Sequence, residues 1–326
     1  MSYPTTERQQ GESDLGRIGL QDFLDLQRRD VAEIVRKQGR PKNVALVVDG
    51  TRRMLQLASE AGVYSYEQDP ANEMRQLMEV SVSAGDILFD MGVEVIIGPL
   101  ATMGNLKRPG FIPHGLKLLL DPLTEEDTLE VLERHHAALT FYGDLDHIRS
   151  QNEGGVIDKY VDFFNQRNPK NPQHRVLVGL GISADSDILS VARLYSTFTS
   201  ESGMTPSVED LRKTYFGFRV PPVDIFIRSN EVKESGCLHP LLESDETQLY
   251  FPTSPGALSI NEKVLRMILY DYLYNRIKSG GTHTHGVLSE EERKFALEFY
   301  QANRDRVIGV GGQVGGDFWV DIPPIE

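Results

Sequence analysis

The sequence has very little cysteine and no long hydrophobic run, and both absences exclude kinds of protein. Its single cysteine, Cys237, excludes an intrachain disulfide and a cysteine-based metal cluster. No apolar run approaches the roughly 20 residues that span a membrane. Residues 1–16 are polar and lack the apolar centre of a signal peptide. We therefore expect a cytoplasmic chain with no transmembrane segment and at most peripheral membrane contact.

Positive charge is also scarce. The 326 residues include 34 Lys and Arg against 48 Asp and Glu, which gives a formal net charge of −14. General nucleic-acid binding needs a basic surface that displaces counterions, so we expect no nucleic-acid partner. A phosphorylated small substrate is not excluded, because a few local arginines can bind it inside an acidic protein.

Six short runs rich in apolar residues alternate with helical patterns. The runs cover residues 44–48, 93–98, 137–143, 175–182, 223–228 and 247–251. Most are almost continuously apolar, which is typical of strands buried on both faces of a parallel sheet. Apolar residues at helical spacing mark residues 71–91, 124–134, 188–198, 261–278 and 289–303, with Thr124 and Ser289 as expected caps. The alternation predicts an α/β fold with one mostly parallel six-stranded sheet flanked by helices. We expect a flexible tail over residues 1–19 and a single domain over residues 20–326.

The first predicted strand runs directly into Asp49-Gly50-Thr51-Arg52-Arg53. Ligands of open α/β sheets bind at the carboxyl ends of strands. Gly50 permits a sharp turn close to a ligand, and a helix starting near Thr51 would favour an anion. Arg52 and Arg53 supply planar donors that match phosphate oxygens. Asp49 would repel a phosphate unless a hard cation bridged the two, so the motif predicts a Mg2+–diphosphate site with Asp49 as metal ligand. The alternative is that Asp49 caps a helix and both arginines are solvated.

Two further polar segments follow predicted strands. Arg228 leaves the fifth strand just before Glu231, and either faces the same crevice as Asp49 or forms a salt bridge with Glu231. Asn105 and Arg108 lie in the loop after the second strand, where they could bind the ligand or simply belong to a polar loop.

Five segments together resemble the cis-prenyltransferase (undecaprenyl diphosphate synthase) superfamily, in order and spacing across residues 40–312. They read VALVVDGTRRML, NLKRPG, PPVDIFIRSNE, QLYF and NRDRVIGVGG. The resemblance implies that family's fold over residues 20–326, Mg2+ as cofactor and an allylic prenyl diphosphate as substrate. It places Gly50, Thr51, Asn105, Arg108, Phe111, Arg228 and Glu231 in substrate binding. It also implies a homodimer, in which the region around Arg306 reaches across the interface.

The chain is similar above all to the divergent branch typified by tuberculosinyl adenosine transferase. That branch shares DGTRR, VAEIVR (31–36), FYGD (141–144) and an LRMILYDYLY-like helix (265–274). The resemblance implies ionisation of an allylic diphosphate of about diterpene size, with Asp49, Arg52 and Arg53 acting on the leaving group. The cation would then be cyclised, deprotonated or captured by water or a nucleoside.

Departures from the chain-elongating members favour the same interpretation. Thr51 and Arg52 replace Asn and Gly of their first motif, and Gln248 replaces an acidic residue. The segment after Arg228 lacks the downstream Arg-x-Ser that grips isopentenyl diphosphate. Arg228 itself remains, so chain elongation stays an alternative, and a non-catalytic partner subunit is a third.

The hydrocarbon is expected to lie in an apolar tunnel between the sheet and the helices around residues 71–91 and 114–120. Aromatic faces could stabilise the cation by about 2 kcal/mol or more each when dry. Tyr64, Tyr66 and Phe111 are the candidates, with Tyr66 assigned to catalysis. Ordinary core packing is the alternative for each.

Overall fold

The centre of the molecule is a six-stranded parallel sheet. The computed structural model describes residues 18–49, 70–151, 155–230, 232–234, 236–254, 256–276, 289–314 and 318–320. The sheet strands lie in the order β3-β4-β2-β1-β5-β6, so β1 and β2 are central. They are β1 (Asn43–Val47), β2 (Val95–Thr102), β3 (Ala137–Gly143), β4 (His174–Ile182), β5 (Ile225–Arg228) and β6 (Gln248–Tyr250). All five pairings are parallel, which confirms the predicted α/β sheet.

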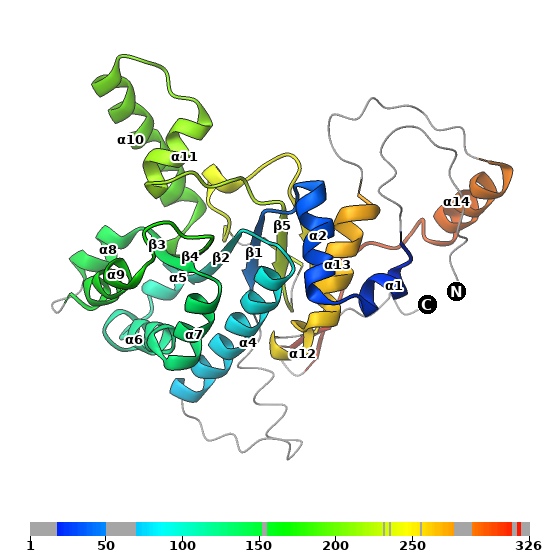
Figure 1. Cartoon of the computed structure of the whole chain (residues 1–326), viewed down its shortest axis with the longest axis horizontal. Helices are drawn as coiled ribbons and strands as arrows, with labels where there is room; N and C mark the ends of the chain where they lie inside the picture. Colours follow the sequence, from blue (N-terminus) through cyan, green and yellow to red (C-terminus); the bar gives the residue numbers. More distant parts are fainter. Residues whose placement is uncertain are drawn as a thin grey trace.

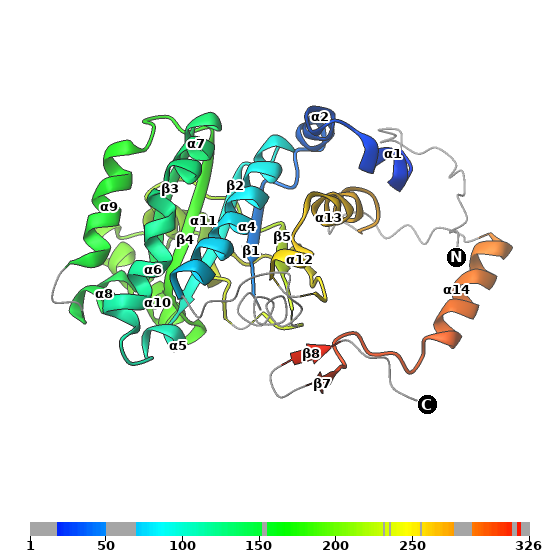
Figure 2. The same ribbon diagram turned by 90° about the horizontal axis from the view of Figure 1, so that it is seen from below.

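Helices cover both faces of this sheet (Figures 1 and 2). The larger core lies on the face covered by α2 (Arg28–Gln38), α4 (Pro70–Asp90), α6 (Leu116–Leu120), α7 (Glu126–Arg134), α9 (Val156–Arg167) and α13 (Glu262–Tyr274). The second core packs against α11 (Val208–Phe216) and the short helix η3 (Pro240–Leu242). Because apolar side chains of the central strands enter both cores, these strands read as continuous hydrophobic runs.

The remaining elements connect or extend this body. They are α1 (Leu20–Asp25), α5 (Met103–Leu106), η1 (Phe111–Gly115), η2 (Asp121–Thr124), α8 (Leu145–Ser150), α10 (Ala184–Ser202), α12 (Gly256–Ser259), α14 (Glu290–Ala302) and the antiparallel hairpin β7 (Gly312–Val314) and β8 (Phe318–Val320). None of the described helices is long and apolar enough to cross a membrane.

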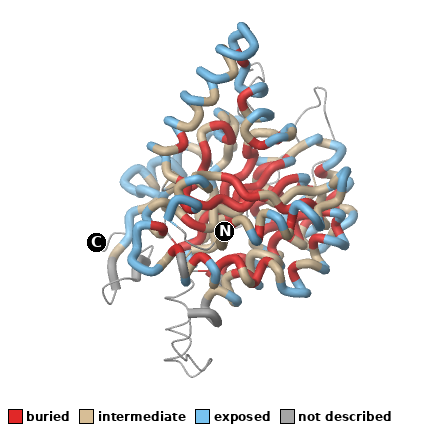
Figure 3. The backbone as a smooth tube through the Cα atoms, turned by 90° about the vertical axis from the view of Figure 1, so that its left-hand side faces the viewer, coloured by how far each residue is buried: buried red, intermediate tan, exposed pale blue. Residues whose placement is uncertain are grey.

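Burial is concentrated in the sheet and in the inner sides of its helices (Figure 3). Helix α10 has one buried residue, Asp187, and projects from the body together with α11 (Figure 1). Helix α14 has no buried residue and lies apart from the sheet (Figures 1 and 2). Its predicted cap is confirmed, since Ser289 accepts a hydrogen bond from the backbone N–H of Glu292.

One predicted cap is wrong. Helix α7 has Glu125, not Thr124, at its N-cap position, and the Glu125 side chain makes no capping bond. Thr124 ends the preceding short helix η2, where its hydroxyl donates to the carbonyl of Asp121 at 2.8 Å. Because the Thr124 hydroxyl is hydrogen-bonded within the preceding turn, it does not cap α7.

Candidate active site

Asp49 and Arg228 meet at the carboxyl edge of the sheet. Strand β1 pairs with β5 so that Val47 lies opposite Arg228, which places the two strand ends side by side. Arg228 Nη2 donates to Asp49 Oδ2 at 2.6 Å. The Asp49 backbone is held as well, because its N–H donates to Ser229 Oγ at 2.8 Å and its carbonyl accepts from Gly256 N at 2.7 Å. The sequence thus brings two predicted site residues together across 179 positions of chain.

Arg228 is the more deeply buried partner. Its side chain is 7% exposed, against 32% for that of Asp49. Nη1 donates to the carbonyl of Glu234 at 3.1 Å and lies 3.9 Å from Cys237 Sγ, whereas Nε is buried with no hydrogen-bond partner among the described residues. Burial raises the pKa of the Cys237 thiol to about 11, with Arg228 opposing the shift. An unpaired buried guanidinium N–H is uncommon, and a bound anion or water would satisfy it.

Several predicted site residues lie outside the described residues. These are Gly50, Thr51, Arg52, Arg53, Tyr66 and Glu231, together with Tyr64. Their roles in metal, diphosphate and cation binding stay predictions.

The other three predicted residues are described and lie after β2. Asn105 Oδ1 accepts hydrogen bonds from the backbone N–H and the hydroxyl of Thr102, at 2.9 and 2.8 Å, and so caps α5. Arg108 is exposed. Phe111 packs against the larger core and against Gly115, where an added Cβ would come within 2.8 Å of its ring. Asn105 therefore has a structural task, while ligand binding by all three stays a prediction.

An apolar cavity with an empty volume of about 870 Å³ lies between the sheet and helices α4 and α7. One wall comes from β1, β2, β3 and β4, and the opposite wall from the apolar faces of the two helices. Val48, the residue before Asp49, is part of the lining. The cavity therefore reaches the carboxyl end of β1, one residue before Asp49.

The cavity offers almost no polar group to a ligand. Two lining residues, Ser81 and Thr128, carry hydroxyl groups, and both donate to backbone carbonyls, of Leu77 at 2.8 Å and of Pro122 at 2.9 Å. Because these hydroxyls are already paired, the lining suits a hydrocarbon. The lining differs from the predicted tunnel at one point: α4 contributes as expected, but α7 replaces residues 114–120, whose helix α6 has Leu116, Leu119 and Leu120 buried in the core.

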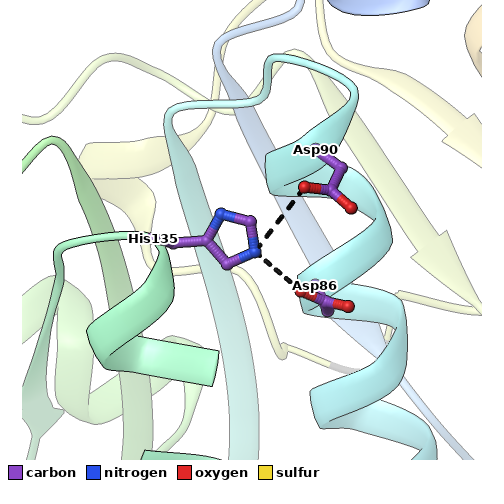
Figure 4. A group of neighbouring side chains, drawn as sticks. All are labelled: Asp86, Asp90 and His135. Carbon is purple, nitrogen blue, oxygen red and sulfur yellow. Dashed lines mark hydrogen bonds and ion pairs between the residues drawn. The ribbon is translucent and has the colours of Figure 1, made fainter. Parts of the chain in front are cut away.

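A second group of ionisable side chains lies at the C-terminal ends of α4 and α7, just before β3 begins (Figure 4). His135 Nε2 is 2.7 Å from Asp86 Oδ1 and 3.9 Å from Asp90 Oδ1. The carboxylates also pair with arginines, Asp86 with Arg134 and Asp90 with Arg28. Burial acts to raise the pKa of Asp86, but hydrogen bonds from His135 and Arg134 hold it below its usual value.

None of these three residues was among the site residues predicted from the sequence. The spacing of Asp86 and Asp90, four residues apart on one helix, was the available signal. The three residues could in principle hold a metal ion. Each of the two carboxylates is already paired with a guanidinium group. Both carboxylates also lie at the end of α4 that is away from Asp49. We therefore interpret the group as an ion-pair cluster that joins α4 to α7 and α2.

The ligand chemistry at Asp49, at the end of β1, suits Mg2+. The ion commonly takes one or two carboxylates and completes its octahedron with water and substrate phosphates. Asp49 supplies one partly exposed carboxylate with a cationic side chain beside it, one residue beyond the lining of an apolar cavity. Such a corner suits a metal that binds together with a diphosphate rather than one held by protein alone.

Comparison with known proteins supports the fold more firmly than the activity. No family model matches the chain. A stretch of 105 residues is 31% identical to (+)-kolavelool synthase of Herpetosiphon aurantiacus, covering 32% of this chain and 34% of that protein, so the chain spans about a third of that relative's length. The crystal structure of lavandulyl diphosphate synthase from Lavandula x intermedia, in complex with dimethylallyl diphosphate, matches with a TM-score of 0.59 at 14% identity, over 76% of this chain and 98% of that one. The chain therefore has the fold of lavandulyl diphosphate synthase, as the resemblance predicted, whereas its place in the narrower branch stays a prediction.

Proposed function

We propose that this chain is a Mg2+-dependent enzyme that ionises an allylic prenyl diphosphate of about diterpene size and releases diphosphate. The observation that carries the proposal is the Asp49–Arg228 pair at the strand ends, one residue beyond a cavity whose described side chains offer no unpaired polar group. The pair suits a diphosphate and the cavity suits its hydrocarbon. The similarity to a kolavelool synthase and to a structure that binds dimethylallyl diphosphate supports the same substrate class.

In the proposed reaction, the bond between the allylic carbon and the bridging oxygen breaks, and both electrons leave with diphosphate. Mg2+ at Asp49 would neutralise negative charge on the departing group. Arg228 keeps the Asp49 carboxylate in place through a 2.6 Å hydrogen bond and adds positive charge at the same edge. Arg52 and Arg53 are the further candidates for this role. The dry cavity lining excludes water from the allylic cation until it is cyclised, deprotonated or captured by water or a nucleoside.

Two other functions remain as alternatives. A cis-prenyl chain elongator would use isopentenyl diphosphate as a second substrate, and the buried, unpaired Nε of Arg228 is the observation that favours a second anion. A non-catalytic partner subunit would need no metal ligand, so the position of Asp49 at the cavity speaks against it.

One experiment separates the three. The purified protein is incubated with Mg2+ and geranyl, farnesyl or geranylgeranyl diphosphate, with and without isopentenyl diphosphate, and the products are identified by mass. We expect diphosphate and a terpene alcohol or hydrocarbon, unaffected by isopentenyl diphosphate. Longer prenyl diphosphates would establish elongation instead, and unchanged substrates under all conditions would favour a partner role. A homodimer and a cytoplasmic location are part of the proposal, to be checked by sedimentation and by cell fractionation.

A further inference from the structure

Gly98 lies in the middle of the cavity wall. It belongs to the central strand β2, where it pairs with Val178 of β4, and both residues line the cavity. On the same face of β2, two residues away on either side, Ile96 and Leu100 also line it. Gly98 is thus the one position without a side chain among the four β2 residues that line the cavity, the others being Ile96, Pro99 and Leu100.

No contact within the described protein explains a glycine at this position. An added Cβ at Gly98 would meet no atom within 4 Å, and the backbone is not in the left-handed region that favours glycine. Other glycines near the cavity and sheet differ: a Cβ at Gly85 would touch Ile96 at 3.5 Å, and one at Gly179 would clash with Tyr142 at 2.7 Å. Glycine inside a strand weakens it by about 0.5–1 kcal/mol relative to alanine. Such a glycine often marks a place where a ligand approaches the backbone.

The strand is also irregular at this point. The pairing of β1 with β2 ends at Ile97, and the β2–β4 register shifts between Pro99 and Ala101. Pro99 follows Gly98 and has no N–H to give to the neighbouring strand. Bulges of this kind recur beside active sites, where they change the direction of a strand. Gly98 therefore leaves empty space in the cavity wall next to the point where β2 departs from regular pairing.

We propose that Gly98 is a specificity-determining residue, which admits long hydrocarbons to the deep half of the cavity. The inference rests on the proposed function, because it assumes that the hydrocarbon of a prenyl diphosphate occupies this space. Gly98 lies four positions before the strand end at Thr102, which places it roughly 13 Å below the carboxyl edge at about 3.3 Å per residue. The carbons nearest the diphosphate lie above Gly98. Only the distal part of a longer chain passes over it toward Ile96 and Phe89.

The test is a series of substitutions that add volume at this one position: Gly98→Ala, Gly98→Val and Gly98→Leu. Binding is measured by calorimetry with geranyl and geranylgeranyl thiolodiphosphates, whose carbon–sulfur bond resists ionisation, so the readout does not require turnover. We expect affinity for the geranylgeranyl analogue to fall in steps, by about a hundredfold for leucine, while that for the geranyl analogue changes by less than about threefold.

Ile97→Val is the matched control. It alters the same strand by one methylene on the opposite face, where Ile97 belongs to the second core, and should not change the affinity ratio of the two analogues. Thermal unfolding of each variant checks the fold, and the alanine variant keeps the test valid if leucine is not tolerated.

Equal losses for both analogues, or no loss for either, would overturn the role of Gly98. These outcomes are separable from failure of the proposed function. If the wild-type protein releases no diphosphate but the length-dependent binding loss is seen, the reaction is wrong and the role of Gly98 stands. If the wild-type protein releases diphosphate but Gly98→Leu changes the affinity for both analogues equally, only the role of Gly98 is wrong.

Discussion

Replacing Arg228 by methionine should separate the contribution of the Asp49–Arg228 pair to stability from its contribution to chemistry. The substitution removes a 2.6 Å charge-assisted hydrogen bond to Asp49 and a 3.1 Å bond to the carbonyl of Glu234. A hydrogen bond to a charged group contributes about 1.5–3 kcal/mol, and water at the one-third exposed Asp49 reduces that, so we expect a loss of about 2 kcal/mol. Unfolding of 326 residues carries an entropy of about 0.7 kcal/mol/K, so the Tm should fall by about 3 °C.

The chemical effect should be far larger than this loss of stability. Removing one preorganised donor from a developing anion typically slows a reaction by about a hundredfold or more, and we expect that reduction in diphosphate release. Arg28→Met is the control, because Arg28 makes a similar pair of bonds, to Asp90 at 2.9 Å and Glu262 at 2.6 Å, away from the cavity mouth. It should lower the Tm without slowing release. If Arg228→Met lowers the Tm and leaves diphosphate release at the wild-type rate, the pair has no part in catalysis.

Two further predictions follow from buried ionisable groups near the strand ends. Burial raises the pKa of Asp187 to about 6, above the unfolded value of about 3.9, so its favourable contribution exists below pH 4 and is lost as the pH rises through 6. Asp187→Asn should therefore stabilise the protein at pH 8 by about 1–2 kcal/mol and by less than half as much at pH 4.5, as measured by thermal unfolding, and equal effects at both pH values would contradict this assignment. Cys237 is buried with a pKa raised to about 11, so iodoacetamide at pH 8 should leave it unmodified in the native protein and alkylate it in urea. Rapid alkylation of the folded protein, detected by mass, would show that the thiol is accessible.

The sheet was predictable because the strands carry their own signal. A strand buried on both faces, such as Val95–Thr102, must be apolar at successive positions, and four of the six runs were followed by a helical pattern. Helix ends were less predictable. The Thr124 hydroxyl could serve either the turn before it or the helix after it, and only the backbone geometry decided in favour of the turn.

The candidate site was predictable in part. Asp49 and Arg228 each end an apolar run, and parallel strands bring such ends to one edge, although their direct ion pair depends on β1 and β5 being neighbours. The Asp86–His135 cluster and the open space at Gly98 were not predictable. Spacing places Asp86 and Asp90 on one helix face, but it does not show that His135 meets them or that space is left at Gly98. Both of these depend on how separate elements pack.

Diphosphate release by Asp49→Asn tests the central claim most directly. The variant keeps the size of the side chain and removes the charge that would bind Mg2+ and accept from Arg228. With geranylgeranyl diphosphate and Mg2+, we expect release to fall by about a hundredfold or more relative to the wild type, with the Tm within a few degrees. Release at the wild-type rate with unchanged dependence on Mg2+ would show that the reaction is not centred on Asp49.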